Sequence, residues 1–205
     1  MFPTTSDLDT ELSAVNSVLG AIGQSPITTL DFDNPEVSFV HNLLMESSRD
    51  VQNEGWVFNT ENNFPLTPDE NGYIQIPSNM LRIDATGNDI DRTIDPVKRN
   101  GRLYDKYHHT DVWDKNKTFY ADILWLFDFD DLPSVFKRYI THRTSVRAAI
   151  QLVANSELAK LLATQEAYSR AACLEYETQQ GDYNFLGNPQ GTTYRSYVPY
   201  FNLPR

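Results

Sequence analysis

Apolar residues recur at helical spacing in two stretches near the start of the chain. The first stretch holds Leu12, Val15, Leu19 and Ile22. Residues 6–9 (SDLD) have the form of a capping box before it, and Gly23 lies where a helix end favours a left-handed residue. The second stretch holds Val37, Val40, Leu44 and Val51. It follows Asn34-Pro35, an N-cap with proline at the first helical position, and it stops at Gly55.

Two more helical stretches lie near the end of the chain, where no proline interrupts residues 134–188. The third helix is predicted to begin at Leu132-Pro133, after three aspartates whose charge suits the positive end of a helix dipole. Those aspartates are Asp128, Asp130 and Asp131, and the predicted buried stripe is Phe136, Tyr139, Ile140, Val146, Ile150 and Val153. The fourth helix is predicted to begin at Asn155-Ser156 and to stop near Gly181. Its apolar residues are Leu158, Leu161, Leu162, Ala172 and Tyr176. We expect the two helices to form an antiparallel hairpin.

Between the helix pairs, residues 56–130 carry strand and turn signals. Asn100-Gly101 is the strongest hairpin signal, because both residues tolerate the positive φ of a type I′ turn. The other strand-like runs are WVF at 56–58, YIQI at 73–76 and the stretch 119–125, and PDENG at 68–72 is a predicted turn. The pattern predicts an α+β fold: an antiparallel helical bundle of about four helices, with a small antiparallel β subdomain inserted between helix 2 and helix 3.

The 205 residues suffice for one domain that carries a subdomain, and a chain of this length needs neither a disulfide nor a metal ion to bury a core. Four segments are expected. They are the N-terminal helices of the bundle at 1–55, the β-rich insertion at 56–131, the C-terminal helix hairpin at 132–181 and an extended aromatic tail at 182–205. The tail holds Tyr183, Phe185, Tyr194, Tyr197, Tyr200 and Phe201. This density of aromatic residues favours docking onto a partner over packing on the chain itself.

The net charge of −11 is unevenly distributed. Residues 1–60 hold nine acidic residues and one basic residue, whereas residues 132–205 hold five acidic and eight basic residues. An acidic chain repels nucleic-acid phosphates at long range, which disfavours general DNA binding. The acidic first third could instead meet the basic last third, within one chain or between neighbouring copies. Two unrelated solvated faces are the other interpretation.

Several classes of protein are disfavoured by what the sequence lacks. Cys173 is the single cysteine and cannot form an internal disulfide, and the longest apolar run, at 123–127, is far shorter than a membrane span. The acidic first residues predict no signal peptide, so we expect folding in a cytoplasm and no membrane insertion. Phosphate-binding glycine motifs, HExxH and CxxC are absent, and no cofactor is expected.

Three groups of side chains could carry chemistry. A loop with Asp105, His108, His109 and Asp111 could bind an ion, although adjacent side chains point apart and a structural role is the simpler interpretation. Cys173 is expected to be a packing residue, because no histidine lies near it in the sequence. Two sets of acids could supply the carboxylate pair of a glycan hydrolase, which is the alternative function. These sets are Asp128, Asp130 and Asp131, and Glu54 with Glu61.

The predicted third helix is strongly basic and carries no acid between Pro133 and Ser156. Arg143 and Arg147 share one face of it at i, i+4. This face could contact residues 1–60 of a neighbouring copy or passing DNA, as in a DNA-binding terminator protein, or it could be solvated. The candidate partner or subunit interface residues are Lys137, Arg138, Arg143, Arg147, Tyr194, Tyr197, Tyr200 and Phe201. No catalytic, cofactor-binding or metal-binding residue is predicted.

Several stretches taken in order resemble a known family. ELSAVN at 11–16, LGAIG at 19–23, Pro26 and Thr29-Leu30 resemble the opening of the tail tubular protein A family, the portal–nozzle adaptors of short-tailed bacteriophages. EGWVFN at 54–59 resembles the family's helix-to-strand junction, and LEYE at 174–177 followed by GDYN at 181–184 resembles its C-terminal segment. The resemblance covers residues 8–186, and residues 187–205 depart from the family pattern.

The resemblance implies a structural virion protein that is not an enzyme and needs no cofactor. Proteins of this family are helical bundles with a β-rich insertion, and they assemble as a twelve-membered ring. The implied partners are other copies of the chain, the portal protein, the nozzle (tail tubular protein B), a tail fibre and genomic DNA in transit. The implied location is the virion tail, with the host cytoplasm during assembly.

Overall fold

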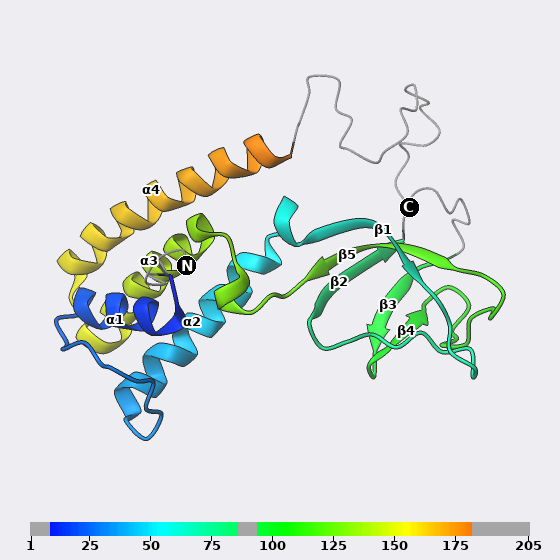
Figure 1. Ribbon diagram of the computed structural model, residues 1–205, viewed down its shortest axis with the longest axis horizontal. Coiled ribbons are helices and arrows are strands. Elements are labelled where there is room, and N and C mark those ends of the chain that lie inside the picture. Colours follow the sequence, from blue (N-terminus) through cyan, green and yellow to red (C-terminus); the bar gives the residue numbers. More distant parts are fainter. Residues whose placement is uncertain (1–8, 86–93, 182–205) are drawn as a thin grey trace, which may run out of the picture.

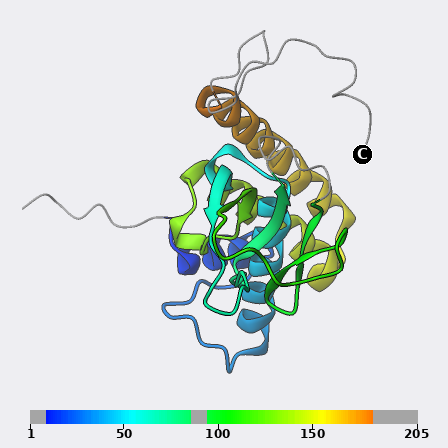
Figure 2. The same ribbon diagram turned by 90° about the vertical axis from the view of Figure 1, so that its right-hand side faces the viewer.

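The computed structural model describes residues 9–85 and 94–181, which form a helical bundle and a β-rich module at opposite ends of the long axis (Figure 1). The bundle consists of α1 (Glu11–Ala21), α2 (Pro35–Asn53), α3 (Ser134–Ala148) and α4 (Ser156–Gln180). All strands of the module lie between α2 and α3 in the sequence. Viewed from the module (Figure 2), the strands lie in front and α4 crosses behind them. The predicted α+β fold with an inserted strand subdomain is confirmed.

The start of α1 differs from the prediction. The helix begins at Glu11, and its N-cap is Thr10, whose hydroxyl accepts a hydrogen bond from the Ser13 amide at 3.3 Å. A second free amide of this first turn, that of Glu11, donates to Asp130 Oδ1 at 3.0 Å. The predicted capping box at 6–9 is therefore wrong, because Thr10 and a distant aspartate satisfy the first turn. Residues 6–8 lie outside the described residues.

The second helix has the predicted limits. Asn34 Oδ1 accepts from the Glu36 amide at 3.0 Å, and Pro35 occupies the first helical position. The chain leaves the helix at Gly55, whose φ of 81° is in the left-handed region. The predicted apolar stripe faces the core, since Val37, Val40, Leu44 and Val51 are all buried. After α1 the chain leaves the helix at Gly23, as it leaves α2 at Gly55, and Gly23 has a left-handed φ of 84°.

The hairpin of α3 and α4 contains a π-helical turn, Ala149–Val153, that the periodicity does not predict. Phe136, Tyr139 and Ile140 are buried as expected, but Ile150 and Val153 are 57% and 41% exposed. The wider π turn shifts the following side chains away from the buried stripe, and Ala154 reverses the chain in a left-handed conformation. Burial of Ile150 and Val153 was therefore a wrong prediction. On α4, which Asn155 caps as predicted, Leu162 is buried whereas Leu161 is 69% exposed and Ala172 is exposed.

The module consists of a three-stranded antiparallel sheet and a hairpin. The sheet has the order β1 (Thr60–Leu66), β5 (Phe119–Trp125), β2 (Met80–Ala85). The hairpin joins β3 (Pro96–Arg99) to β4 (Arg102–Asp105) through Asn100 and Gly101, whose φ values of 52° and 72° confirm the predicted turn. A second core, separate from that of the bundle, contains Leu66, Ile74, Ile76, Met80, Leu103, Phe119, Ala121 and Ile123.

Two predicted strand-like runs do not form strands. In the first run, Val57–Asn59 forms a 3₁₀ turn in which Asn59 Oδ1 accepts from the Trp56 amide at 2.9 Å. Residues 73–76 are irregular, and within them Gln75 forms an isolated bridge with Arg102 of β4. The real strand β1 has a polar sequence with a proline, which is tolerated because β1 is at the edge of the sheet.

Two buried side-chain amides join the bundle to the module. Gln52, on α2, donates to the Phe127 carbonyl at 3.0 Å and accepts from the Phe127 amide at 2.8 Å. Asn59 donates to the carbonyls of Gln52 and Trp125 at 3.0 and 2.9 Å. Both side chains are fully buried. They therefore satisfy the backbone where β5 ends and hold it against the end of α2.

An aromatic cluster covers this joint. The Trp56 ring lies 4.9 Å from that of Phe136, Phe58 lies 4.5 Å from Phe136, and Tyr176 of α4 packs on the same ring at 5.9 Å. The Trp56 indole donates to the Val51 carbonyl at 2.7 Å. The end of α4 is thus packed against the segment that leads into the module.

Gln52→Leu should lower the free energy of unfolding by about 3 kcal/mol, because it leaves the polar groups of Phe127 without partners in a buried site. Urea denaturation followed by circular dichroism measures the change. Gln24→Leu, at an exposed position, is the matched control and should change stability little. Equal stability of the two variants would show that these amides do not hold the joint.

Candidate functional site

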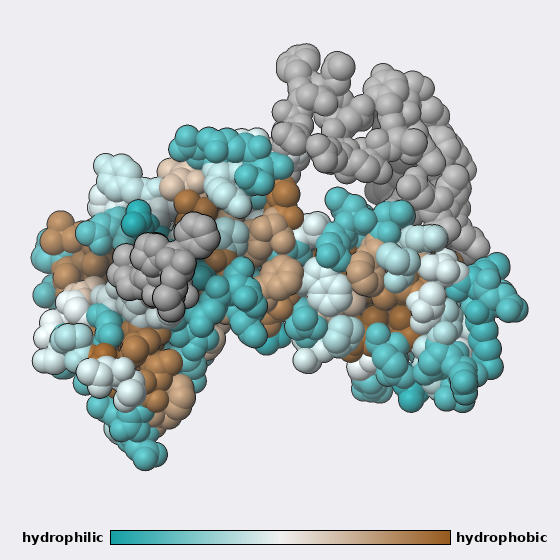
Figure 3. Space-filling model, in the orientation of Figure 1, coloured by the Kyte–Doolittle hydropathy of each residue, from teal (hydrophilic) through white to brown (hydrophobic). Residues whose placement is uncertain are grey.

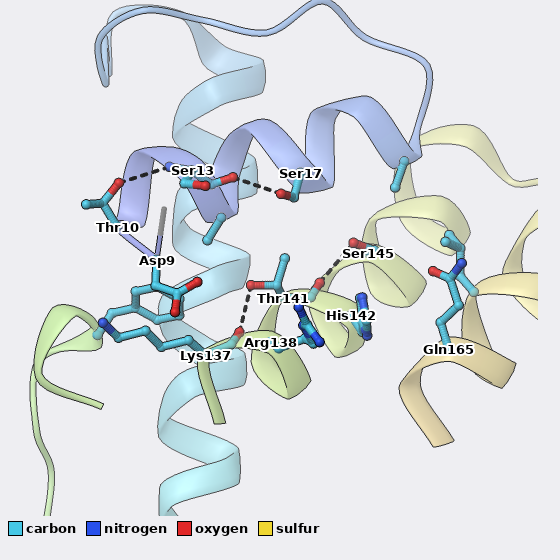
Figure 4. A pocket seen from close by; sticks show the side chains of 14 residues that line it. Asp9, Thr10, Ser13, Ser17, Lys137, Arg138, Thr141, His142, Ser145 and Gln165 are labelled. Atoms are coloured by element: carbon cyan, nitrogen blue, oxygen red, sulfur yellow. Dashed lines mark hydrogen bonds between the residues drawn. The ribbon is translucent and has the colours of Figure 1, made fainter. Parts of the chain in front are cut away.

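The predicted basic interface residues of α3 divide into two groups with different neighbours. Arg143 and Arg147 point to α2, whereas Lys137 and Arg138 line a groove between α1, α3 and α4 (Figure 4). The aromatic candidates Tyr194, Tyr197, Tyr200 and Phe201 lie outside the described residues.

Arg147 is engaged within the chain by three residues of α2. Its guanidinium lies 2.8 Å from Glu46 Oε2 and 3.6 Å from Asp50 Oδ2, and it donates to the buried Ser47 hydroxyl at 2.9 Å. This arrangement couples α2 and α3 through charge as well as through apolar packing. The Arg147 charge is therefore largely balanced within the subunit.

Glu54 connects three helices. Its carboxylate accepts from Arg143 of α3 at 3.4 Å and from Arg170 of α4 at 2.9 Å. Both guanidiniums also donate to the Tyr139 hydroxyl, at 3.1 and 2.7 Å. The bond to Glu54, followed by the bond to Tyr139, raises the pKa of Arg170, so the cation is stabilised. Part of the acidic first third thus meets the basic last third within one chain, as one interpretation of the charge distribution predicts.

The groove between α1, α3 and α4 has a volume of ≈350 Å³ and a mostly polar lining. In Figure 4, side chains of α1 and of α3 face each other across it. Lys137 Nζ donates to the Asp130 carbonyl at 2.7 Å. Within residues 9–85 and 94–181, no carboxylate lies within ion-pair distance of Lys137 or Arg138. Asp9 is the acidic residue of the lining, which also includes Thr10, Ser13, Ser17, Thr141, Ser145, Leu162 and Gln165.

His142 adds no fixed charge to this groove. Its Nδ1 lies 2.9 Å from the Ser169 hydroxyl of α4. Burial, and after it the charge of Arg138, lower the pKa of His142. The ring is therefore neutral near pH 7, and the positive charge of the groove comes from Lys137 and Arg138.

The loop with Asp105 is a closed turn rather than an ion site. Asp105 accepts from His108 Nδ1 at 2.5 Å and from the amides of Tyr107 and Asp95 at 2.8 and 3.2 Å. Burial raises the pKa of Asp105, but these hydrogen bonds outweigh it and lower the pKa overall. Asp111 instead faces Arg102 at 3.4 Å. Across the described segments, no group of three or more His, Cys, Asp or Glu side chains has the arrangement of a metal site.

Three acids of the glycan-hydrolase alternative, Asp130, Glu54 and Glu61, have partners within the subunit. Asp130 caps α1 rather than the helix that follows it, and α3 has Pro133 as its N-cap without a side-chain bond. Glu54 is held by two arginines, and Glu61 accepts from the Trp125 indole at 3.0 Å. Asp130 thus satisfies the first turn of α1.

Cys173 is a buried packing residue, as expected from the sequence. It is fully buried in the bundle core, and its thiol donates to the Val135 carbonyl at 3.4 Å. Burial raises the pKa of Cys173 to about 12. The thiol is therefore not a nucleophile near neutral pH.

In the part of the chain that the structure describes, no helix is both long and apolar enough to cross a membrane.

Two exposed features are not among the sequence-predicted site residues. Phe32, between Asp31 and Asp33 in the loop before α2, is 54% exposed. Four apolar residues at the α3–α4 turn are more than two-fifths exposed, namely Ile150, Leu152, Val153 and Leu161. Hydrophobic surface is visible at the outer edge of the bundle in Figure 3. An aromatic residue between two acids in a predicted loop is the sequence signal that could have identified the first feature.

The stretches that carry the family resemblance meet in the bundle. Asn16, in the first stretch, binds both the amide and the carbonyl of Ile27, at 2.7 and 2.9 Å. Glu177, in the last stretch, accepts from the Val57 amide with both carboxylate oxygens at 3.0 Å. The stretches 54–59 and 174–177 are therefore in direct contact, although 120 residues separate Val57 from Glu177 in the sequence.

The sequence matches known proteins over most of its length. The family model described as tail tubular protein matches residues 12–183. The chain is also similar to tail tubular protein A of Klebsiella phage KP34, with 26% identity over 171 residues. That alignment covers 83% of this chain and 88% of the relative. Both matches include the bundle and the inserted module.

Asp105→Asn should destabilise the β module by about 2 kcal/mol at pH 7, because it removes a charged acceptor of several hydrogen bonds. The pKa of Asp105 is lowered on folding, so its contribution is present above the unfolded value of about 3.9 and is lost as the pH falls through the folded value. The difference in the free energy of unfolding between Asp105→Asn and the unchanged chain should therefore shrink below about pH 4. Urea denaturation at several pH values measures this difference.

Asp114→Asn, at an exposed acid of the same module, is the control for this experiment. A stability difference for Asp105→Asn that stays constant from pH 7 to pH 3 would contradict the assigned role of this carboxylate.

Proposed function

The chain belongs to the tail tubular protein family, and we propose that it is the ring-shaped adaptor between the portal and the tail nozzle of a short-tailed phage. As a family member it is a structural component of the virion tail that interacts with other tail proteins. The observation that carries the proposal is the extent of the match, which runs from α1 to the end of α4. The likeness therefore concerns the whole architecture and not one module.

In the proposed assembly, twelve copies of the chain form a closed ring. One face of the ring docks on the portal, and the other holds the nozzle, tail tubular protein B. A tail fibre attaches near that junction, and genomic DNA passes through the bore during ejection. The subunit is made in the host cytoplasm and acts in the virion tail. Residues 1–55 and 132–181 form the bundle of the subunit, 56–131 its β-rich insertion and 182–205 its tail.

The internal bonding of the subunit supports a mechanical role over a catalytic one. Of the glycan-hydrolase candidates, Asp130 caps a helix, Glu54 accepts from two arginines and Glu61 accepts from a tryptophan. These three carboxylates hold parts of the subunit together, which gives each of them a structural role. We propose that the chain has no enzymatic activity and needs no cofactor.

The acidity of the chain supports a role as a conduit. A net charge of −11 repels the phosphates of passing DNA, so DNA does not adhere to a wall built from many copies. The arginines Arg143, Arg147 and Arg170, which could bind phosphate, are instead paired with Glu46 and Glu54. Tight, salt-dependent binding to DNA is therefore not part of the proposed function.

The purified chain of 23.5 kDa should remain monomeric alone and form a closed ring when its portal is added. Mass photometry of the mixture should show the portal mass increased by about twelve subunits, as a heterologous interface closes on a symmetric template. Portal alone is the control. A chain that stays monomeric with portal present contradicts the proposal.

Deletion of residues 187–205 should weaken assembly on the portal while leaving the thermal transition nearly unchanged, because the described core ends before this segment. Differential scanning calorimetry and mass photometry measure the two effects. If the truncated chain does not fold, the segment is part of the core and the proposed tail role is wrong.

A further inference from the structure

Two surfaces of the bundle carry charges that have no ion-pair partner among residues 9–85 and 94–181. Of the described acids in the first third, Glu46, Asp50 and Glu54 pair with arginines of α3 and α4, and Glu11 faces His41. Asp9 lines the groove. The remaining described acids of the first third lie together, just before α2 and in its first turn. The two bases of the groove, Lys137 and Arg138, carry the opposite charge.

The first surface is an acidic loop, defined by Asp31, Phe32, Asp33 and Glu36. Asp31, Phe32 and Asp33 are exposed and Glu36 is half-buried. In residues 9–85 and 94–181 none of the three carboxylates has a cationic group within ion-pair distance. The Phe32 ring packs edge-on against His41 at 4.9 Å, and Asp31 Oδ1 accepts from the Asp33 amide at 3.0 Å. The loop therefore presents an exposed aromatic ring between two carboxylates in a defined conformation.

The second surface is the basic groove between α1, α3 and α4, with Lys137 and Arg138 along one side. Small side chains such as Ser13, Ala14 and Ser17 form the α1 wall, which leaves room in the groove. A cavity of about 150 Å³ already holds a benzene ring, so ≈350 Å³ accommodates one phenylalanine side chain. Near pH 7 the positive charge of the groove comes from Lys137 and Arg138, since burial keeps His142 neutral.

The acidic loop cannot occupy the groove of its own subunit. In Figure 4 the loop that leaves α1 runs on one side of this helix, and the groove residues of α3 lie on the other side. The loop is also anchored, since Asn16 binds both backbone groups of Ile27 and Phe32 packs on His41. The two surfaces can therefore meet only between copies.

We propose that the acidic loop of one copy docks in the basic groove of the next copy, with Phe32 inserted and its flanking aspartates facing Lys137 and Arg138. This contact rests on the proposed ring, and it identifies the surfaces that the ring uses. The surfaces are complementary to each other and not to themselves, so the contact is heterologous and propagates around a ring until it closes. Opposite charges at its rim fix the register and disfavour other pairings.

Charge reversal tests the contact during assembly on the portal. Lys137→Glu with Arg138→Glu should lower the yield of rings by at least about tenfold, because three carboxylates then face two more. Asp31→Lys with Asp33→Lys should do the same. A chain with all four changes should recover ring formation to within about threefold of the unchanged chain, since the reversed charges again attract. Mass photometry counts the rings.

Lys115→Glu with Lys117→Glu, at exposed residues of the β module, is the matched control and should leave the yield unchanged. A disulfide provides a second measurement. With Cys173 replaced by Ala, Phe32→Cys and Ser17→Cys in one chain should give a ladder of covalent oligomers under oxidation in the ring, and neither change alone should do so.

The outcomes separate this inference from the proposed function. If the unchanged chain forms no ring with portal, the proposed function and this contact both fail. If it forms rings and the groove reversal leaves their yield unchanged, the contact is wrong and the function stands. If the groove reversal lowers only the thermal transition, the groove serves the chain's own fold and the contact is again wrong.

Discussion

The relation between the bundle and the β module depends on the hydrogen bonds of two buried amides. Gln52 pairs with the backbone of Phe127 as a neighbouring strand would, and Asn59 binds the carbonyls on both sides of the joint. Neither amide can exchange its partners for water, because both are fully buried. The bundle and the module have separate apolar cores, so this polar contact, together with the aromatic cluster over it, fixes their relative orientation.

Ion pairs between helices have two effects in the bundle. Acids of α2 and of its C-cap, Glu54, neutralise three arginines of α3 and α4, which binds the three helices together. The exposed ion pairs among them add little stability individually, but the Glu54 pairs share one hydroxyl, Tyr139, and act as a network. The two bases of the groove remain outside this pairing, so they can specify a partner of opposite charge.

The elements with local signals could be predicted from the sequence. Asn34, Pro35 and Gly55 determine the limits of α2 by their own backbone chemistry, and Asn100-Gly101 determines the hairpin in the same way. The wrong strand predictions have their causes in tertiary structure. WVF at 56–58 forms a turn because Asn59 is drawn into the joint, and the polar sequence of the edge strand β1 lacks the apolar alternation that predicts a strand. For the candidate site, periodicity predicts that Lys137 and Arg138 lie on a basic helix. The groove between these residues and α1 could not be predicted, because it depends on how the helices pack.

The chain crosses between bundle and module twice, and the two crossings are bonded to each other. Asn59 on the outgoing segment holds Trp125 on the returning one, and the first residue of β1 pairs with Leu124 beside it. Bending the module away from the bundle would therefore have to distort both crossing segments and the bonds between them. The double crossing thus restricts rotation of the module on the bundle more than one connecting segment would.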